Sequence, residues 1–104
     1  ELYSKKIVAM IAGQCHPAHK HAMKDETFEV LWGHLSLIID ESQTIDLTPG
    51  DTYRIHPNTL HSFSTNTGVV FEEIATEATP GDSEYMKQND KNRKSKLDEF
   101  WALF

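Results

Sequence analysis

Turn signals recur along most of this chain and leave room only for short extended segments between them. They stand at Gly13-Gln14, Gly33, Pro49-Gly50, Pro57-Asn58 and Thr67-Gly68. The runs between them are rich in apolar and β-branched residues, which favour strands. About eight strands at roughly eight- to ten-residue spacing are typical of a β-sandwich or barrel. The sequence therefore predicts an all-β fold.

The C-terminal quarter has a different character. Residues 79–96 are polar and without periodicity, which predicts a loop or arm. Within 97–104, apolar residues stand at i, i+3, i+4 and i+7, which predicts a short amphipathic helix. We therefore expect a β-barrel over 1–78, followed by an arm and helix over 79–104. This helix would pack on the barrel, on a second subunit or on a domain outside the sequence.

Charge and composition exclude some partners. The net charge is −6 and the pI is near 5.4, which argues against binding nucleic acid or an anionic membrane. The sequence has no apolar run of transmembrane length. Cys15 is the single cysteine, so an intramolecular disulfide is excluded and a cytoplasmic location is expected. The chain begins at Glu1 almost directly with a strand-like run, and we expect it to be a domain of a longer polypeptide, although removal of a tag or N-terminal processing would give the same start.

One stretch, GQCHPAHKHAMKDETFEVLWG over residues 13–33, carries the chemistry. His19 and His21 are two apart, so on a strand they share a face. Glu26 opens the next strand-like run, and His61 begins a later one. Three imidazoles and a carboxylate suit a divalent transition metal such as Zn, Mn, Fe, Ni or Co. The alternative is a set of scattered surface histidines, because His-x-His is common by chance.

The same stretch resembles the first motif of the cupin superfamily. That motif spaces a glycine, a His-x-His pair, a glutamate and a second glycine as Gly13, His19, His21, Glu26 and Gly33 are spaced here. The resemblance implies a small cupin barrel, that is, a double-stranded β-helix or jelly roll. It also implies that His19, His21, Glu26 and His61 bind the metal.

The second cupin motif is matched in part. Gly50 and His61 stand in register with it, and Asn58 replaces its usual glycine. Asparagine tolerates positive φ better than most residues, so the turn should form. Thr65 stands where the motif ends in asparagine. Of the other histidines, we expect His34 and His56 on the outer face or at a rim, and His16 at a strand entry; the sequence assigns none of them a role.

Two sugar-handling cupin groups resemble the chain further. The D-lyxose isomerase type shares Lys6 with the following Gly13-Gln14, Glu26-Thr27-Phe28 and the segment Pro57–His61. This resemblance implies catalytic roles for two residues. Glu73 would carry a proton between C1 and C2 of the sugar, and Lys6 would stabilise the enediolate. From alternation alone, either Glu72 or Glu73, and either Lys5 or Lys6, would point inward; the alternative is that all four side chains are exterior and solvated.

The other group is the cupin appended to N-acetylneuraminate (sialic acid) and related nonulosonate synthases. The segments HPAHKHAMKDETFEVLWG, HSFSTNTGVVFEEIATEA, GDSEYM and NDKNRKSK resemble it. Together the resemblances imply a metal-binding domain that handles a small sugar or sugar acid. It would be either an accessory domain with a synthase domain upstream or a small metal-dependent aldose–ketose isomerase.

Two other functional classes remain open at this level. A stand-alone Fe(II)-dependent dioxygenase-type cupin uses the same four ligands, and a non-catalytic ligand-binding or structural cupin needs none of the acid–base groups. Since small cupins pair their sheet edges, and an exposed edge is a liability that association removes, we also predict a homodimer.

Overall fold

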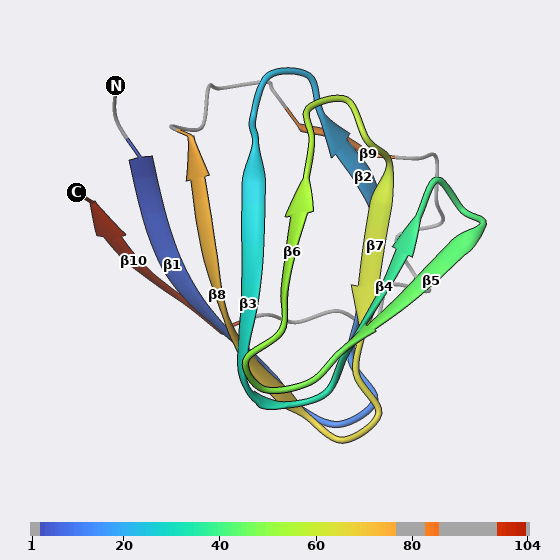
Figure 1. The fold of residues 1–104 in the computed structure, drawn as a ribbon, viewed down its shortest axis with the longest axis vertical. Coiled ribbons are helices and arrows are strands. Elements are labelled where there is room, and N and C mark those ends of the chain that lie inside the picture. Colours follow the sequence, from blue (N-terminus) through green and yellow to red (C-terminus); the bar gives the residue numbers. More distant parts are fainter. Residues whose placement is uncertain (1–2, 77–82, 86–97, 104) are drawn as a thin grey trace.

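Two five-stranded antiparallel sheets face each other in the computed structural model, which describes residues 3–76, 83–85 and 98–103 (Figure 1). One sheet has the order β10 (Asp98–Leu103), β1 (Tyr3–Met10), β8 (Val69–Thr76), β3 (Glu26–Gly33) and β6 (Thr52–Ile55). The other has the order β5 (Gln43–Leu47), β4 (Leu35–Ile39), β7 (His61–Ser64), β2 (Cys15–His21) and β9 (Ser83–Tyr85). The predicted all-β jelly-roll architecture is confirmed.

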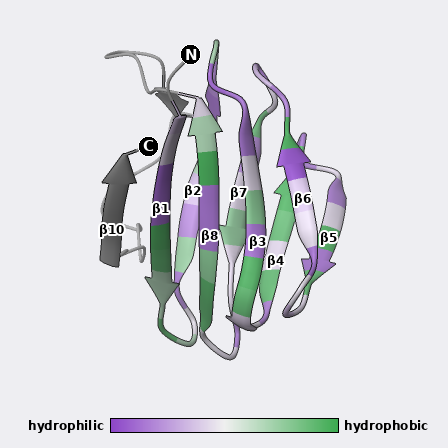
Figure 2. Ribbon diagram, turned by 60° about the vertical axis from the view of Figure 1, so that its left-hand side comes forward, coloured by the Kyte–Doolittle hydropathy of each residue, from purple (hydrophilic) through white to green (hydrophobic). Residues whose placement is uncertain are grey.

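The core lies between the sheets and is built by residues that alternate along each strand. Figure 2 shows hydrophobic and hydrophilic residues alternating along β3 and β8. Phe28, Phe63 and Phe71 form an aromatic cluster with ring centroids 5.0 to 5.7 Å apart. The other buried apolar residues of this core are Val8, Met10, Val30, Leu35, Leu37, Ile39, Leu47, Ile55 and Val69.

Gly33 ends β3 at a point where two turns approach closely. Its φ is +83°, and a Cβ at this position would overlap the carbonyl oxygen of Gly68, in the turn between β7 and β8. Gly13 has a similar φ of +87°, but a Cβ there would meet nothing within 4 Å. Alanine variants at the two positions therefore distinguish the stability lost through positive φ from the stability lost through steric overlap with Gly68.

We expect Gly33→Ala to destabilise the fold more than Gly13→Ala. The second variant pays only the conformational cost of positive φ, roughly 1–2 kcal/mol. The first must also push the turn at Gly68 away and should lose about 3 kcal/mol or more. Chemical denaturation measures both free energies of unfolding, and equal losses would show that the close approach does not matter.

The C-terminal segment differs from the sequence-based prediction. Where a helix was predicted over 97–104, Asp98–Leu103 form β10 and pair antiparallel with β1, Ser4 opposite Leu103 through Ala9 opposite Asp98. Strand pairing satisfies the backbone groups that β1 would otherwise expose at the edge of its sheet. An eight-residue pattern rich in aromatic residues suits a strand as well as a helix, so its periodicity could not decide between them.

Most of the polar arm predicted over 79–96 lies outside the described residues. Its described part, β9, pairs with β2. In the part of the chain that the structure describes, no helix is long and apolar enough to span a membrane. The homodimer stays a prediction.

Candidate metal centre

The predicted metal ligands meet at one end of the barrel. His19 and His21 lie at the end of β2, Glu26 begins β3 and His61 begins β7. The loop from β2 to β3 lies beside the loop from β6 to β7 (Figure 1), and the N–H of Asn58 donates to the carbonyl of His21 at 2.6 Å. Asn58 has a φ of +62°, as its place in the second motif predicted.

The three imidazoles are buried and close enough to share one ion. Each of His19, His21 and His61 offers a ligand atom, and these atoms lie within 4.8 Å of one another. The ring centroids of His19 and His61 are 4.2 Å apart. Three imidazoles at this spacing fit a transition-metal ion.

Backbone carbonyls orient two of these rings. Nδ1 of His19 donates to the carbonyl of Pro17 at 3.1 Å, and Nδ1 of His61 donates to the carbonyl of Thr59 at 2.9 Å. The Nε2 atom of each ring is then left with its lone pair, as in metal sites where a carbonyl holds the other ring nitrogen. Burial, with the nearby His61 and His16, lowers the pKa of His19 to about 3, so this ring is neutral at pH 7.

Glu26 stands between two of the imidazoles. Its Oε1 is 3.3 Å from Nε2 of His21, and its Oε2 is 3.3 Å from Nε2 of His61. Glu26 Oε2 and His61 Nε2 are both buried, and neither has a hydrogen-bond partner within the described chain. These two atoms face each other with lone pairs and no hydrogen between them, and a cation bound by both would satisfy them. The set of donor atoms therefore fits a metal ion.

A line of alternating charges leads away from Glu26. The ammonium of Lys24 is 3.0 Å from Glu26 Oε1 and 3.2 Å from Glu73 Oε1, and the ammonium of Lys6 is 3.6 Å from Glu73 Oε2. Lys24 and Glu73 are 7% and 6% exposed. The register of β1 against β8 places Lys6 opposite Glu73, which is why both point inward. Lys5 and Glu72 pair with each other on the other face.

Burial and charge shift the pKa values along this line. Burial and the charge of Glu26 raise the pKa of Glu73 to about 7, against the opposing effect of Lys6 and Lys24. Burial alone would raise the pKa of Glu26, but the adjacent imidazoles of His21 and His61 and the charge of Lys24 hold it far below its usual range. Burial alone would lower the pKa of Lys24, but the carboxylates of Glu73 and Glu26 outweigh it, so the pKa is raised and the lysine is cationic at pH 7.

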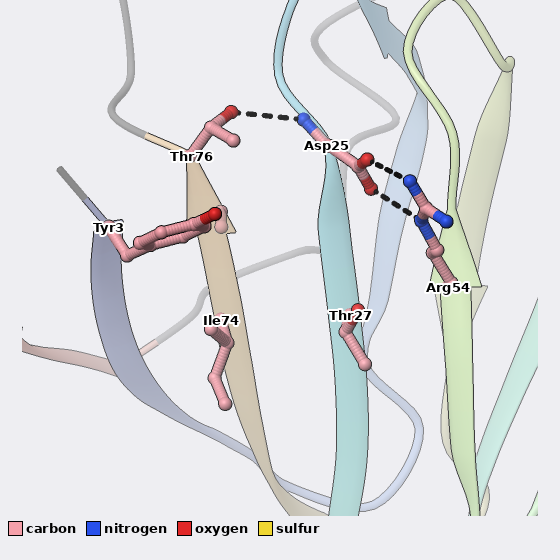
Figure 3. Close-up of a pocket in the computed structure, with 7 residues that line it drawn as sticks. Tyr3, Asp25, Thr27, Arg54, Ile74 and Thr76 are labelled. Atoms are coloured by element: carbon pink, nitrogen blue, oxygen red, sulfur yellow. Dashed lines mark hydrogen bonds and ion pairs between the residues drawn. The ribbon is translucent and has the colours of Figure 1, made fainter. Parts of the chain in front are cut away.

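The residue before Glu26 anchors this carboxylate from the outer face. Asp25 accepts two hydrogen bonds from the guanidinium of Arg54 on β6, at 2.6 and 3.1 Å. Its N–H donates to the hydroxyl of Thr76 on β8 at 3.1 Å (Figure 3). The start of β3 is thus tied to both neighbouring strands, which holds Glu26 against the imidazoles.

The fold, the two histidine-bearing segments and the inward carboxylate match one known family. A family model described as "Cupin domain" matches residues 6–75. The chain belongs to the cupin family. A solved cupin protein from Bacteroides fragilis is 28% identical, with a TM-score of 0.66, over 73% of this cupin and 66% of that chain.

Two curated relatives are named as sugar isomerases. The D-lyxose/D-mannose isomerase of Thermosediminibacter oceani is 28% identical over 71% of this cupin and 56% of its own length. The D-lyxose ketol-isomerase of a Thermofilum species is 29% identical over 75% of this cupin and 58% of its own length. This cupin thus spans little more than half the length of either relative.

Sequence reasoning missed two residues of the site. Lys24 lies in the loop before Glu26, where a charged side chain is usually solvated, so only its position two residues before the glutamate could have drawn attention to it. His16 lies near the start of β2, where a strand entry was expected, but its burial inside the barrel was not predicted. Its ring stacks on Phe63 at 4.8 Å and meets the ring of His19 edge-on at 4.6 Å.

The remaining histidines lie away from this cluster. His34 is half-buried and lies 3.2 Å from Asp46, beyond the Gly33 turn at the other end of β3. His56 is exposed. Both placements agree with the expectation of an outer face or a rim.

Proposed function

We propose that this cupin binds a divalent transition metal and catalyses aldose–ketose isomerisation of a small sugar. One observation supports this most: a buried carboxylate, Glu73, lies between two lysine ammonium groups, and one of these lysines also contacts Glu26, the carboxylate beside the imidazoles. Isomerisation needs a group that moves a proton between neighbouring carbons and cations that stabilise the charge on neighbouring oxygens.

The residues divide the work as follows. His19, His21, His61 and Glu26 would hold the ion, which when bound polarises neighbouring sugar oxygens. Glu73 takes the proton from C2 of the aldose and returns it to C1, while the hydroxyl proton passes from O2 to O1. The reaction is therefore balanced without a co-reactant.

Two lysines are candidates for stabilising the enediolate. Lys6 is the residue that the sequence resemblance implies, and its ammonium lies 3.6 Å from Glu73. Lys24 is closer, at 3.2 Å from Glu73, and also contacts the metal-binding carboxylate. We therefore add Lys24 to the proposed catalytic residues, with Lys6 next to Glu73 on the other side.

The curated relatives support the class of reaction by their names alone. Both are named for D-lyxose, and one also for D-mannose. These sugars are therefore the first substrates to test. An association with an upstream sialic acid synthase domain stays a prediction, which the sequence of the gene before this segment would test.

The test uses protein stripped of metal by a chelator and reloaded with Mn²⁺, Zn²⁺, Ni²⁺, Co²⁺ or Fe²⁺. Each form is given D-lyxose, D-mannose and a panel of other aldoses in D₂O. We expect ketose formation, with deuterium incorporated at C1 of the ketose, in the loaded protein alone. Metal bound at one ion per chain without exchange for any sugar would contradict the isomerase proposal, and oxygen consumption by the Fe²⁺ form would favour the dioxygenase alternative.

A further inference from the structure

The ammonium group of Lys24 lies inside the proposed metal site and contacts one of its ligands, Glu26. Lys24 is nearly fully buried, and its ammonium lies within 3.2 Å of both Glu26 and Glu73. Burying an ammonium group costs several kcal/mol unless carboxylates compensate it, and here two do. In exchange, Lys24 neutralises the carboxylate that a metal ion would use.

The two oxygens of Glu26 have different surroundings. Oε1 contacts both Lys24, at 3.0 Å, and His21, at 3.3 Å. Oε2 faces His61 and makes no hydrogen bond to any described residue. A divalent ion that binds this carboxylate meets the full charge of Lys24 on the other oxygen, and the two cations repel each other.

We propose that Lys24 sets the cation affinity of the site by competing for Glu26, and that metal binding transfers its ammonium to Glu73. This inference rests on the metal binding of the proposed function. The ammonium already lies 3.2 Å from Glu73, so a small side-chain movement away from Glu26 keeps Lys24 paired. The same movement leaves Lys24 paired with Glu73 alone, so that the proposed base and a cation able to stabilise the enediolate stand side by side in the loaded site. Metal binding and assembly of the catalytic pair are thereby coupled.

The chain offers a matched comparison in Lys6. This lysine is also largely buried, with 12% of its side chain exposed, and it approaches Glu73 from the other oxygen at 3.6 Å. Lys6→Met also removes a buried ammonium group. Lys6 pairs with Glu73, however, whereas Lys24 contacts the proposed metal ligand Glu26 directly. Lys24→Arg moves the charge into a larger group without removing it.

The experiment is calorimetric titration of Mn²⁺ and of Zn²⁺ into chelator-stripped wild type, Lys24→Met, Lys24→Arg and Lys6→Met. We expect the dissociation constant to fall roughly tenfold or more in Lys24→Met for both ions. The repulsion that the variant removes depends on the charge of the ion, which is the same for Mn²⁺ and Zn²⁺. Lys24→Arg should stay near wild type, and Lys6→Met should change less than Lys24→Met.

Thermal unfolding gives a second measurement. Without metal, Lys24→Met leaves the buried carboxylate of Glu26 without its lysine and Glu73 with Lys6 alone, and its Tm should fall by roughly 10 °C. The rise in Tm on saturation with Zn²⁺ should then be larger than in wild type, since the ion replaces the missing charge. If Lys24→Met does not fold without metal, Lys24→Gln is titrated in the same way.

The outcomes separate this inference from the proposed function. Unchanged or weaker binding in the folded Lys24 variant, with wild type binding normally, would overturn the role of Lys24 alone. Failure of wild type to bind either ion would overturn the metal site and with it the proposed function. Tighter binding in Lys24→Met supports the inference whether or not the protein isomerises a sugar.

Discussion

The His61→Ala variant is expected to lose both stoichiometric metal binding and isomerase activity. His61 begins β7 and is 1% exposed. Its Nε2 faces Glu26 Oε2, and neither of these two buried atoms has a hydrogen-bond partner among the described residues. Losing an outer partner of a metal ligand already costs roughly 10- to 100-fold in affinity or activity, so losing the ligand itself should cost more. Metal analysis after dialysis and the isomerase assay measure the two losses.

His34→Ala is the matched control. It removes an imidazole of the same chemistry from beyond the Gly33 turn, where the ring contacts Asp46. We expect one bound ion per chain and unchanged activity in this variant, with a native circular dichroism spectrum in both variants. A His61→Ala protein that still binds one ion per chain would show that the three imidazoles do not form the metal site.

The Glu73→Gln variant should keep its metal and lose its catalysis. Glutamine preserves the shape of the side chain and its oxygen still accepts a hydrogen bond from Lys24 or Lys6, but the amide cannot take up the C2 proton. A positioned general base contributes roughly 10²- to 10⁴-fold to the rate, so kcat should fall by this factor. Deuterium incorporation at C1 of the ketose should fall with it, because exchange and isomerisation use the same proton transfer.

Glu72→Gln makes the same change one residue away on the opposite face of β8. Glu72 pairs with Lys5 on the outer face and lies outside the charge line that ends at Glu26. Its activity should equal that of the wild type. If both glutamine variants kept full activity, Glu73 would not be the base, whereas a loss of metal in Glu73→Gln would assign it to ion binding instead.

Local patterns allowed much of the fold and the site to be predicted. Turn residues and alternation placed the strands up to residue 76, because a strand has a period of two and strained turns favour glycine or asparagine. The His-x-His spacing put His19 and His21 on one face, and the two cupin motifs brought in Glu26 and His61. Each of these inferences depends on residues close together in the chain or on a family pattern.

Other features depended on contacts between distant segments. Alternation left either Glu72 or Glu73 as the inward carboxylate, and the register of β8 between β1 and β3 selected Glu73. The C-terminal segment was predicted as a helix, but the open edge of β1 pairs with it as a strand. The apolar spacing of residues 97–104 favours a helix only weakly, because the segment is short, and strand pairing with β1 decides its structure.

By itself, the sequence determined an all-β barrel of the cupin type and the imidazoles that converge in it, because periodicity and motif spacing are encoded residue by residue. Only the tertiary structure decided that Lys24 enters the site, since a loop lysine is solvated unless distant strands bring two carboxylates to it. Glu26 begins β3 and Glu73 lies on the neighbouring strand β8, so the two carboxylates that pair with Lys24 come together only once the sheet has formed.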